Sequence, residues 1–226
     1  MINHILVGAI ATNCWILPVS MPDGPESGKT ELRDGIVIDP GADAPAIIAR
    51  LERLQLRPRY IILTHGHFDH IAALPDLMRA FEGSGSLEIA IHRDDAHYLG
   101  PGAYEIHQES FAAAGGSGYV EELWQEQPVP SRLLSEGDTI GPFKVLHLPG
   151  HSPGSAGFLL EQEKILFSGD TLFKEGVGRT DLPGGDWPVL QKSLDRLLAL
   201  DHAITVYPGH GPLTSIGAEQ AREGWF

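Results

Sequence analysis

The sequence has a single cysteine in 226 residues, Cys14, so no disulfide can form within the chain. The fold therefore cannot depend on an oxidising compartment. No stretch approaches the roughly 18 consecutive apolar residues of a membrane-spanning helix. Residues 1–17 contain no Lys or Arg, unlike the start of a signal peptide. These absences predict a cytoplasmic protein with a buried thiol.

Positive charge is also scarce, with 16 Lys and Arg against 30 Asp and Glu and a formal net charge of −14. Nucleic acids and anionic membranes bind proteins through clustered Lys and Arg, so neither is expected as a partner. A small anionic substrate is compatible with the negative net charge, because a bound metal ion creates a positive local field. There is no internal repeat or low-complexity tract, and the length suits one domain over residues 1–226. The sequence does not indicate an oligomeric state.

Short apolar runs alternate with helical patterns along the chain. Residues 35–39 and 60–63 read as buried strands, and apolar spacing predicts a helix over residues 44–56 between them. This βαβ unit favours an α/β fold. Further strands are expected over residues 5–17, 87–92, 139–148, 155–160, 164–168 and 204–207, helices over 71–81 and 187–200, a loop over 20–34, and a lid or loop with short helices over 98–130. The order suits two sheets packed face to face with helices outside.

Three histidines and an aspartate follow the strand over residues 60–63: His65, His67, Asp69 and His70. Imidazole and carboxylate are ligands for zinc and other first-row metals. His65 and His67 are two residues apart, so in an extended segment they face the same way. Asp69 and His70 stand where the chain turns into a helix and can reach a neighbouring position. This dense cluster predicts a metal site.

Three later strands each end at one more candidate ligand: His151, Asp170 and His210. Taken singly, each could be an ordinary turn residue, and only the set of four loops is specific. The remaining histidines stand alone, and we expect them to be surface or hydrogen-bonded residues: His4, His92, His97, His107, His147 and His202.

The segment 65–70 (HGHFDH) resembles the His-x-His-x-Asp-His signature of the metallo-β-lactamase-fold superfamily. Segments 149–154 (PGHSPG), 168–171 (SGDT) and 207–212 (YPGHGP) are similar to its later motifs and come in the same order. Within the superfamily, segments 13–15, 38–41 and 178–185 resemble the short bacterial members of the glyoxalase II-like hydrolases.

This resemblance implies an αββα sandwich of two mixed β-sheets with helices on the outer faces. By the same resemblance His65, His67 and His151 would hold one divalent metal, Asp69, His70 and His210 a second, and Asp170 would bridge both. Zinc is the expected metal, with iron or manganese as alternatives. The implied reaction is hydrolysis of a small thioester such as S-lactoylglutathione by a metal-activated water, which the catalytic Asp69 would orient.

Two departures from the family concern the substrate. Arg179 and Asp181 stand where the family has a Lys and a Tyr that contact glutathione, and the family's C-terminal helical domain is not expected here. Arg179 either binds a substrate carboxylate or pairs with Asp181 or Asp186.

Two other functions fit the same motifs. The first is a persulfide dioxygenase-like enzyme with one Fe(II) held by His65, His151 and Asp170. The second is a non-catalytic metal-binding protein of the same fold. The intact second ligand set favours the hydrolase.

Overall fold

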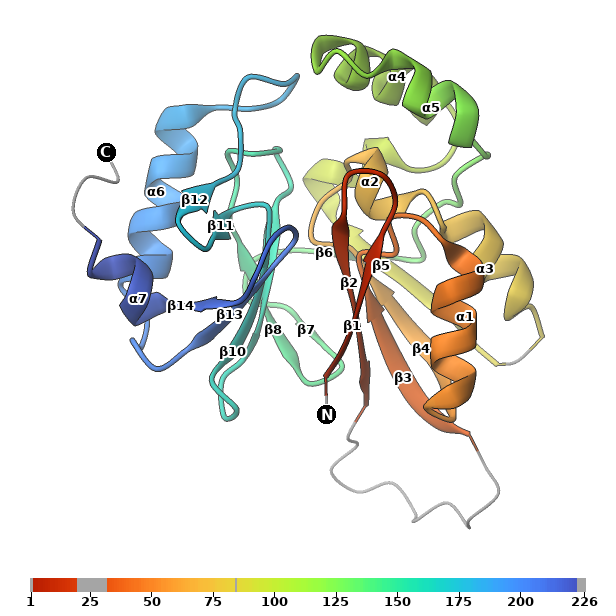
Figure 1. Ribbon diagram of the computed structural model, residues 1–226, viewed down its shortest axis with the longest axis horizontal. Coiled ribbons are helices and arrows are strands. Elements are labelled where there is room, and N and C mark those ends of the chain that lie inside the picture. Colours follow the sequence, from red (N-terminus) through yellow and green to blue (C-terminus); the bar gives the residue numbers. More distant parts are fainter. Residues whose placement is uncertain (1, 20–31, 84, 223–226) are drawn as a thin grey trace.

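The computed structural model describes residues 2–19, 32–83 and 85–222, and it contains two mixed β-sheets packed face to face (Figure 1). The expected loop over residues 20–34 lies mostly outside the described residues. The first sheet has the order β1-β2-β3-β4-β5-β6 and is antiparallel at β1, β2 and β3 and parallel from β3 to β6. Its strands are β1 Asn3–Val7, β2 Thr12–Pro18, β3 Arg33–Ile38, β4 Leu56–Ile62, β5 Glu88–His92 and β6 Arg132–Leu134.

The second sheet has the order β14-β13-β10-β9-β8-β7, and only β10 and β13 run parallel. Its strands are β7 Thr139–Ile140, β8 Phe143–His147, β9 Ala156–Leu160, β10 Ile165–Gly169, β13 Thr205–Pro208 and β14 Thr214–Ser215. A small separate hairpin pairs β11 Leu172–Phe173 with β12 Gly176–Val177.

Alternation along the strands divides the apolar side chains among three cores. In β3, Ile36 and Ile38 pack between the sheets, whereas Val37 packs in the core under the helices. In β10, Phe167 joins the core between the sheets and Leu166 joins the core under α6. Burying each such side chain contributes about 1.5–3 kcal/mol, so the period-two pattern holds the layers together.

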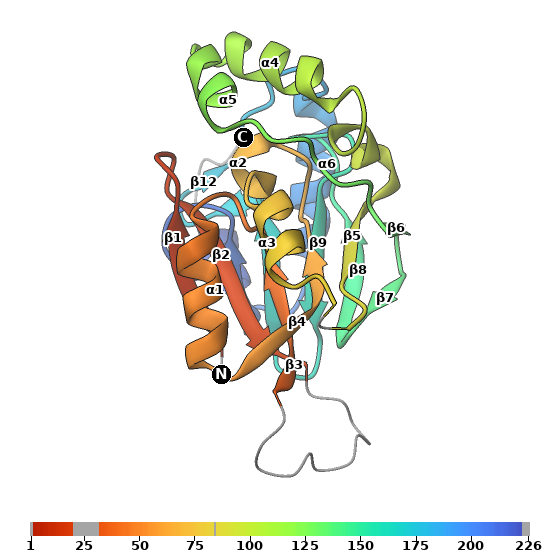
Figure 2. The ribbon, with the colours of Figure 1, turned by 90° about the vertical axis from the view of Figure 1, so that its right-hand side faces the viewer.

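Helices cover both outer faces (Figures 1 and 2). The first sheet carries α1 Ala44–Arg53 and α3 Leu74–Ala80, and the second carries α6 Trp187–Leu198 and α7 Ile216–Gln220. One edge of the sandwich holds α2 Phe68–Ile71, and α4 Ala103–Ala113 and α5 Ser117–Leu123 lie over it, after the 3-10 helix η1 Arg93–Tyr98. Among the described residues, no helix combines the length and apolarity that crossing a membrane requires.

The αββα prediction is confirmed, but several boundaries differ. The single strand expected over residues 5–17 is wrong: a turn with positive φ at Gly8 and Ala11 divides it into β1 and β2. The first helix ends at Arg53 because Gln55 adopts a left-handed conformation and β4 follows. The helix expected over residues 71–81, with a kink or late start around Pro75, starts late as α3 at Leu74, and the separate short helix α2 precedes it. The elements β14 and α7 follow the strand that was expected to be last.

Candidate metal centre

All seven predicted metal ligands lie at one edge of the sandwich, beneath α4 and α5. His65 and His67 follow β4, and Asp69 and His70 lie on the short helix α2. The second sheet supplies the other three from the ends of β8, β10 and β13: His151, Asp170 and His210. The structure therefore brings together all seven residues of the predicted ligand set.

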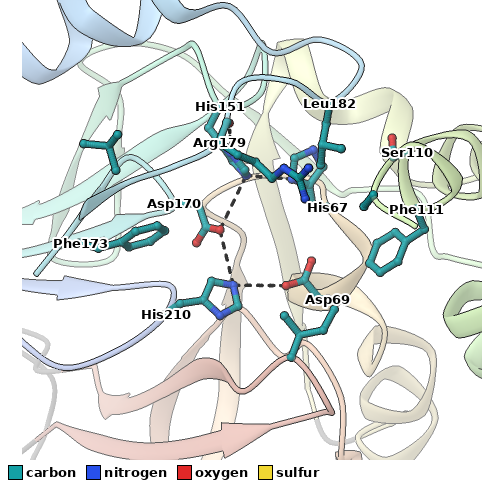
Figure 3. A pocket seen from close by; sticks show the side chains of 13 residues that line it. His67, Asp69, Ser110, Phe111, His151, Asp170, Phe173, Arg179, Leu182 and His210 are labelled. Atoms are coloured by element: carbon teal, nitrogen blue, oxygen red, sulfur yellow. Dashed lines mark hydrogen bonds and ion pairs between the residues drawn. The ribbon is translucent and has the colours of Figure 1, made fainter. Parts of the chain in front are cut away.

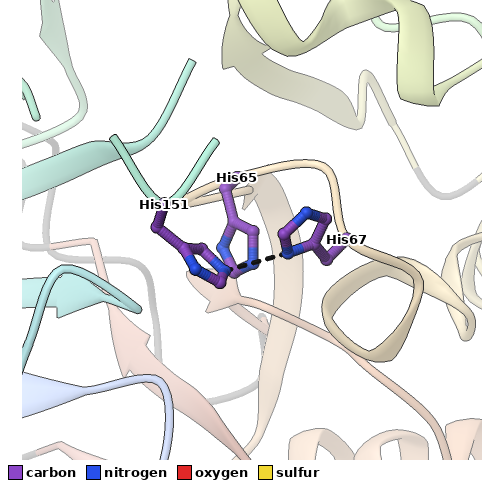
Figure 4. Close-up of side chains that lie close together, drawn as sticks. All are labelled: His65, His67 and His151. Carbon is purple, nitrogen blue, oxygen red and sulfur yellow. Dashed lines mark hydrogen bonds between the residues drawn. The ribbon is translucent and has the colours of Figure 1, made fainter. Parts of the chain in front are cut away.

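The first cluster consists of His65, His67 and His151 (Figure 4). Nδ1 of His67 lies 2.9 Å from Nε2 of His151, and one ring nitrogen of each of the three histidines lies within 4.8 Å of the others. All three side chains are buried. Three imidazoles converging at this spacing can coordinate one metal ion.

The second cluster consists of Asp69, His70 and His210. Nε2 of His210 lies 3.2 Å from Nε2 of His70 and 3.3 Å from Oδ2 of Asp69. The distance from Nε2 of His70 to Oδ2 of Asp69 is 3.5 Å. This group offers two nitrogen donors and one carboxylate oxygen.

Asp170 lies between the two clusters (Figure 3). Its Oδ2 is 3.7 Å from Nε2 of His151 and 3.5 Å from Nε2 of His210. Its Oδ1 is 3.5 Å from Nε2 of His70. One carboxylate thus reaches residues of both groups.

The electrostatics of the site suit a cation. Burial lowers the pKa of His65 and His67 well below the ordinary value, and neighbouring histidines lower it further, which keeps both rings neutral. Burial also opposes protonation of His70, but the carboxylates of Asp170, Asp69 and Asp39 outweigh it and raise the pKa of His70 to about 10. The negative field that retains this proton would also attract a divalent cation.

Unpaired buried atoms test whether the residues fit a metal. Nε2 of His65 and Oδ1 of Asp170 are buried without any hydrogen-bond partner in the described structure. Such groups are costly unless a ligand satisfies them. Nitrogen and carboxylate oxygen donors suit zinc, iron or manganese, so the residues present fit a metal ion.

The opposite ring nitrogens of three histidines are held by other groups. Nδ1 of His65 lies 3.1 Å from the Thr64 hydroxyl, and Nδ1 of His151 lies 2.8 Å from the Arg179 carbonyl oxygen. Nδ1 of His70 lies 3.1 Å from Oδ2 of Asp39. Contacts of this kind fix ring orientation and tautomer, so the other nitrogen points into the centre.

The sequence motifs gave no role to two further supporting residues, Asp39 and Asn13. Asp39 also accepts hydrogen bonds from the Thr64 amide and hydroxyl, at 2.8 and 2.6 Å. Asn13 donates to the carbonyl oxygens of Pro208 and Gly211, which flank His210. Both residues lie in segments that resemble the family, 13–15 and 38–41, but the resemblance did not indicate what either side chain binds.

Arg179 lines the cavity but binds another residue. Its guanidinium donates to both carboxylate oxygens of Asp181, at 2.7 and 2.8 Å. The salt-bridge interpretation of Arg179 therefore describes the present structure, and its expected contact with substrate stays a prediction.

The cavity above the clusters has a volume of about 380 Å³. Phe111 on α4, Phe173 on β11, Leu182 and Ile10 give it apolar walls. The segment 98–130, expected as a lid or a loop with short helices, forms α4 and α5, and α4 forms part of the cavity wall (Figure 3).

Four of the remaining histidines form hydrogen bonds, as expected: His4, His92, His107 and His147. His92, Asp94 and His147 also form a group with ligand atoms within 4.8 Å. The two rings are stacked with centroids 3.9 Å apart and planes 11° apart. One nitrogen of each ring contacts the backbone, Nδ1 of His92 at the Asp94 amide and Nε2 of His147 at the Pro153 carbonyl oxygen, so hydrogen bonds account for this group.

An αββα sandwich with a centre of histidines and carboxylates at one edge defines a class of metal-dependent proteins. Residues 32–210 match the model of the Metallo-beta-lactamase superfamily, and the chain belongs to that superfamily.

Three similar proteins illustrate the range of this family. The chain is 35% identical over 189 residues to the hydroxyacylglutathione hydrolase GloC of Haemophilus influenzae, covering 83% of this chain and 85% of that protein. It resembles the structure of TTHA1623 in a di-iron-bound form with a TM-score of 0.79 and 35% identity, over 97% of both chains. It resembles the BLEG-1 B3 metallo-beta-lactamase with a TM-score of 0.79 and 36% identity, covering 98% of this chain and 97% of that chain.

Proposed function

We propose that this protein hydrolyses a small thioester such as S-lactoylglutathione at a pair of divalent metal ions. The observation that carries the proposal is the position of Asp170 between two complete ligand groups. His65, His67 and His151 would hold the first ion and Asp69, His70 and His210 the second, with Asp170 shared. The similarity to GloC supports the thioester substrate.

Metal ions bound there would supply Lewis acidity, which lowers the pKa of water and stabilises negative charge on a carbonyl oxygen. The chain's own residues would orient the reactants. Asp69 lines the cavity, and its Oδ2 accepts a hydrogen bond of 3.2 Å from the Thr12 hydroxyl. A carboxylate fixed in this way can accept a hydrogen bond from the attacking water and align it.

The leaving group places little demand on the protein. A thiol has a pKa near 8.5, so the thiolate is a stable leaving group and can depart without a dedicated general acid. Cys14 is fully buried in β2, where burial raises its pKa far above the ordinary range. It is therefore not a nucleophile. In the proposed reaction water attacks the thioester directly, and no residue forms a covalent intermediate.

We propose zinc as the metal, with iron or manganese as alternatives, because the donor set suits all three. The cytoplasm is the proposed compartment, and a small molecule is the proposed partner in preference to nucleic acid or membrane. The cavity walls are apolar, and Arg179 is already paired with Asp181. The assay therefore compares thioesters of different carrier thiols.

Metal quantification combined with a hydrolysis assay tests the proposal. We expect about two metals per chain and hydrolysis of S-lactoylglutathione, with a neutral thioester and a β-lactam measured alongside. Asp170→Asn should lower kcat/KM by roughly 100-fold or more, because it weakens the shared ligand. Asp181→Asn, a matched change on an exposed carboxylate, should keep the metal content.

Other results would point elsewhere. One iron per chain with oxygen uptake on glutathione persulfide would favour the dioxygenase. Bound metal without turnover of any of these substrates would favour the non-catalytic metal-binding protein. Two metals with turnover of the neutral thioester alone would keep the hydrolase and exclude glutathione as the carrier.

A further inference from the structure

Asp95 is a buried carboxylate next to the first cluster that the proposed reaction does not use. It lies in η1, directly after β5, and its side chain is 0% exposed. A carboxylate is expensive to bury, so its hydrogen-bond partners show what holds it there.

Three donors converge on this carboxylate. Oδ2 of Asp95 accepts from the Gly66 amide at 2.9 Å and from the Ser152 hydroxyl at 2.6 Å. Oδ1 accepts from the Gly154 amide at 2.5 Å. The approach at Gly154 is so close that a Cβ there would lie 2.5 Å from the Asp95 backbone nitrogen.

All three donors belong to loops that carry the first cluster. Gly66 lies between His65 and His67, and Ser152 directly follows His151. One loop leaves the first sheet after β4, and the other leaves the second sheet after β8. A single carboxylate thus joins the two loops whose histidines must converge.

Asp39 provides a contrast on the other cluster. It binds both Thr64 and the ring of His70, so it contacts a candidate ligand directly. Asp95 has no hydrogen bond to a candidate ligand, and its contacts fix the backbone on either side of the ligands. Asp39 therefore supports a ligand of the second cluster directly and reaches His65 of the first only through Thr64, whereas Asp95 binds the loops of the first cluster alone.

We propose that Asp95 is a positioning residue for the metal held by His65, His67 and His151. Its carboxylate sets the separation of the two ligand loops and so the distance between their imidazoles. This inference rests on the proposed metal function. An amide could not replace the carboxylate, because its NH2 group would face a donor where an acceptor is needed.

Metal affinity measured by chelator competition tests this role, with Asp95→Asn compared with Asp39→Asn. Partners of metal ligands typically change affinity by about 10–100-fold. We expect Asp95→Asn to weaken binding by that factor at the first site alone, and Asp39→Asn to weaken chiefly the second site. The absorption spectra of the cobalt-substituted proteins should change in different bands for the two variants.

Asp94→Asn serves as the matched control, because Asp94 is the adjacent, half-exposed aspartate and should leave both affinities unchanged. Should Asp95→Asn not fold, Ser152→Ala removes one of the three donors and should weaken the same site by roughly 3–10-fold. Wild-type affinity and spectra in a variant with lower thermal stability would overturn the proposal, because that is the result of a purely structural role. Failure of the wild-type protein to bind metal would instead overturn the proposed function.

Discussion

At the residue scale, His107 makes the stability of the protein depend on pH. It is fully buried on α4, and its Nε2 donates to the Tyr98 carbonyl oxygen at 2.8 Å, while Nδ1 has no partner in the described structure. Burial lowers the pKa of His107 to about 4, from an ordinary value near 6.5. The folded protein therefore excludes a proton that the unfolded chain binds.

The sign of the effect follows from this difference. Above pH 6.5 neither state is protonated and His107 costs nothing, whereas between pH 6.5 and 4 the unfolded state gains the proton first. The free energy of unfolding should fall by about 3 kcal/mol across that window. His107→Gln keeps a donor for the Tyr98 carbonyl oxygen but cannot titrate, so its loss of stability with acid should be smaller by about that amount.

Denaturant unfolding of metal-free protein at pH 7.5 and 4.5 measures this prediction, because chelation removes acid-induced metal release from both samples. His65 and His67 remain in both proteins, so their contribution cancels in the comparison. Equal acid dependence in the two proteins would show that His107 already carries a proton in the folded state.

Residues with a sequence signature could be predicted, whereas residues that act through the fold could not. The seven candidate ligands follow strands in recognisable segments, and the structure brings them all together. Asp95 lies 29 residues from Gly66 and 59 from Gly154 along the chain, and no local pattern links them. The pairing of Arg179 was one of two open interpretations, because sequence cannot decide between a neighbouring carboxylate and one on a substrate.

At the scale of elements, the turn after β3 packs directly against α2. A Cβ on Gly41 would lie 1.7 Å from the Asp69 carbonyl oxygen, a contact with backbone that no rotamer change can relieve. The turn can therefore pack this closely against the helix that carries Asp69 and His70 only because Gly41 has no side chain.

Gly41→Ala should therefore displace α2 and lower both stability and metal content. We expect a loss of about 2–4 kcal/mol, as for severe overpacking, and fewer than two metals per chain. Gly118→Ala is the matched control: no atom lies within 4 Å of its Cβ position in α5, and alanine favours a helix, so stability should rise by about 0.5–1 kcal/mol. Denaturant unfolding and metal analysis of both variants measure the difference, and a Gly41→Ala protein with normal metal content would contradict the proposed fit.

Elements with strong periodicity were predicted better than the turns between them. The β3-α1-β4 unit matches the expected order of strand, helix and strand, because apolar spacing marks the helix. The β1–β2 turn was missed, because Gly8 and Ala11 lie within the apolar run over residues 5–11, which contains no Asn, Asp or Pro.

At the scale of the whole molecule, the candidate ligands are divided between the two halves of the sandwich. The first sheet and α2 supply four of them, and the loops of the second sheet supply His151, Asp170 and His210. The core between the sheets holds the halves together by apolar contact, as with Ile38 and Phe167. Metal ions at the edge would join the same halves a second time.

Removing the metal should therefore lower the melting temperature of the entire protein. An ion present at 1,000 times its Kd stabilises the folded state by about 4 kcal/mol, and in a chain of this size that shifts Tm by roughly 8–16 °C for one site. Calorimetry before and after chelation, with metal content measured on each sample, gives the shift, and added zinc should restore it. Asp170→Asn should respond less to the chelator, because it lacks the carboxylate that lies between both clusters. An unchanged Tm in fully metal-free protein would mean that the apolar core alone sets the cohesion of the two sheets.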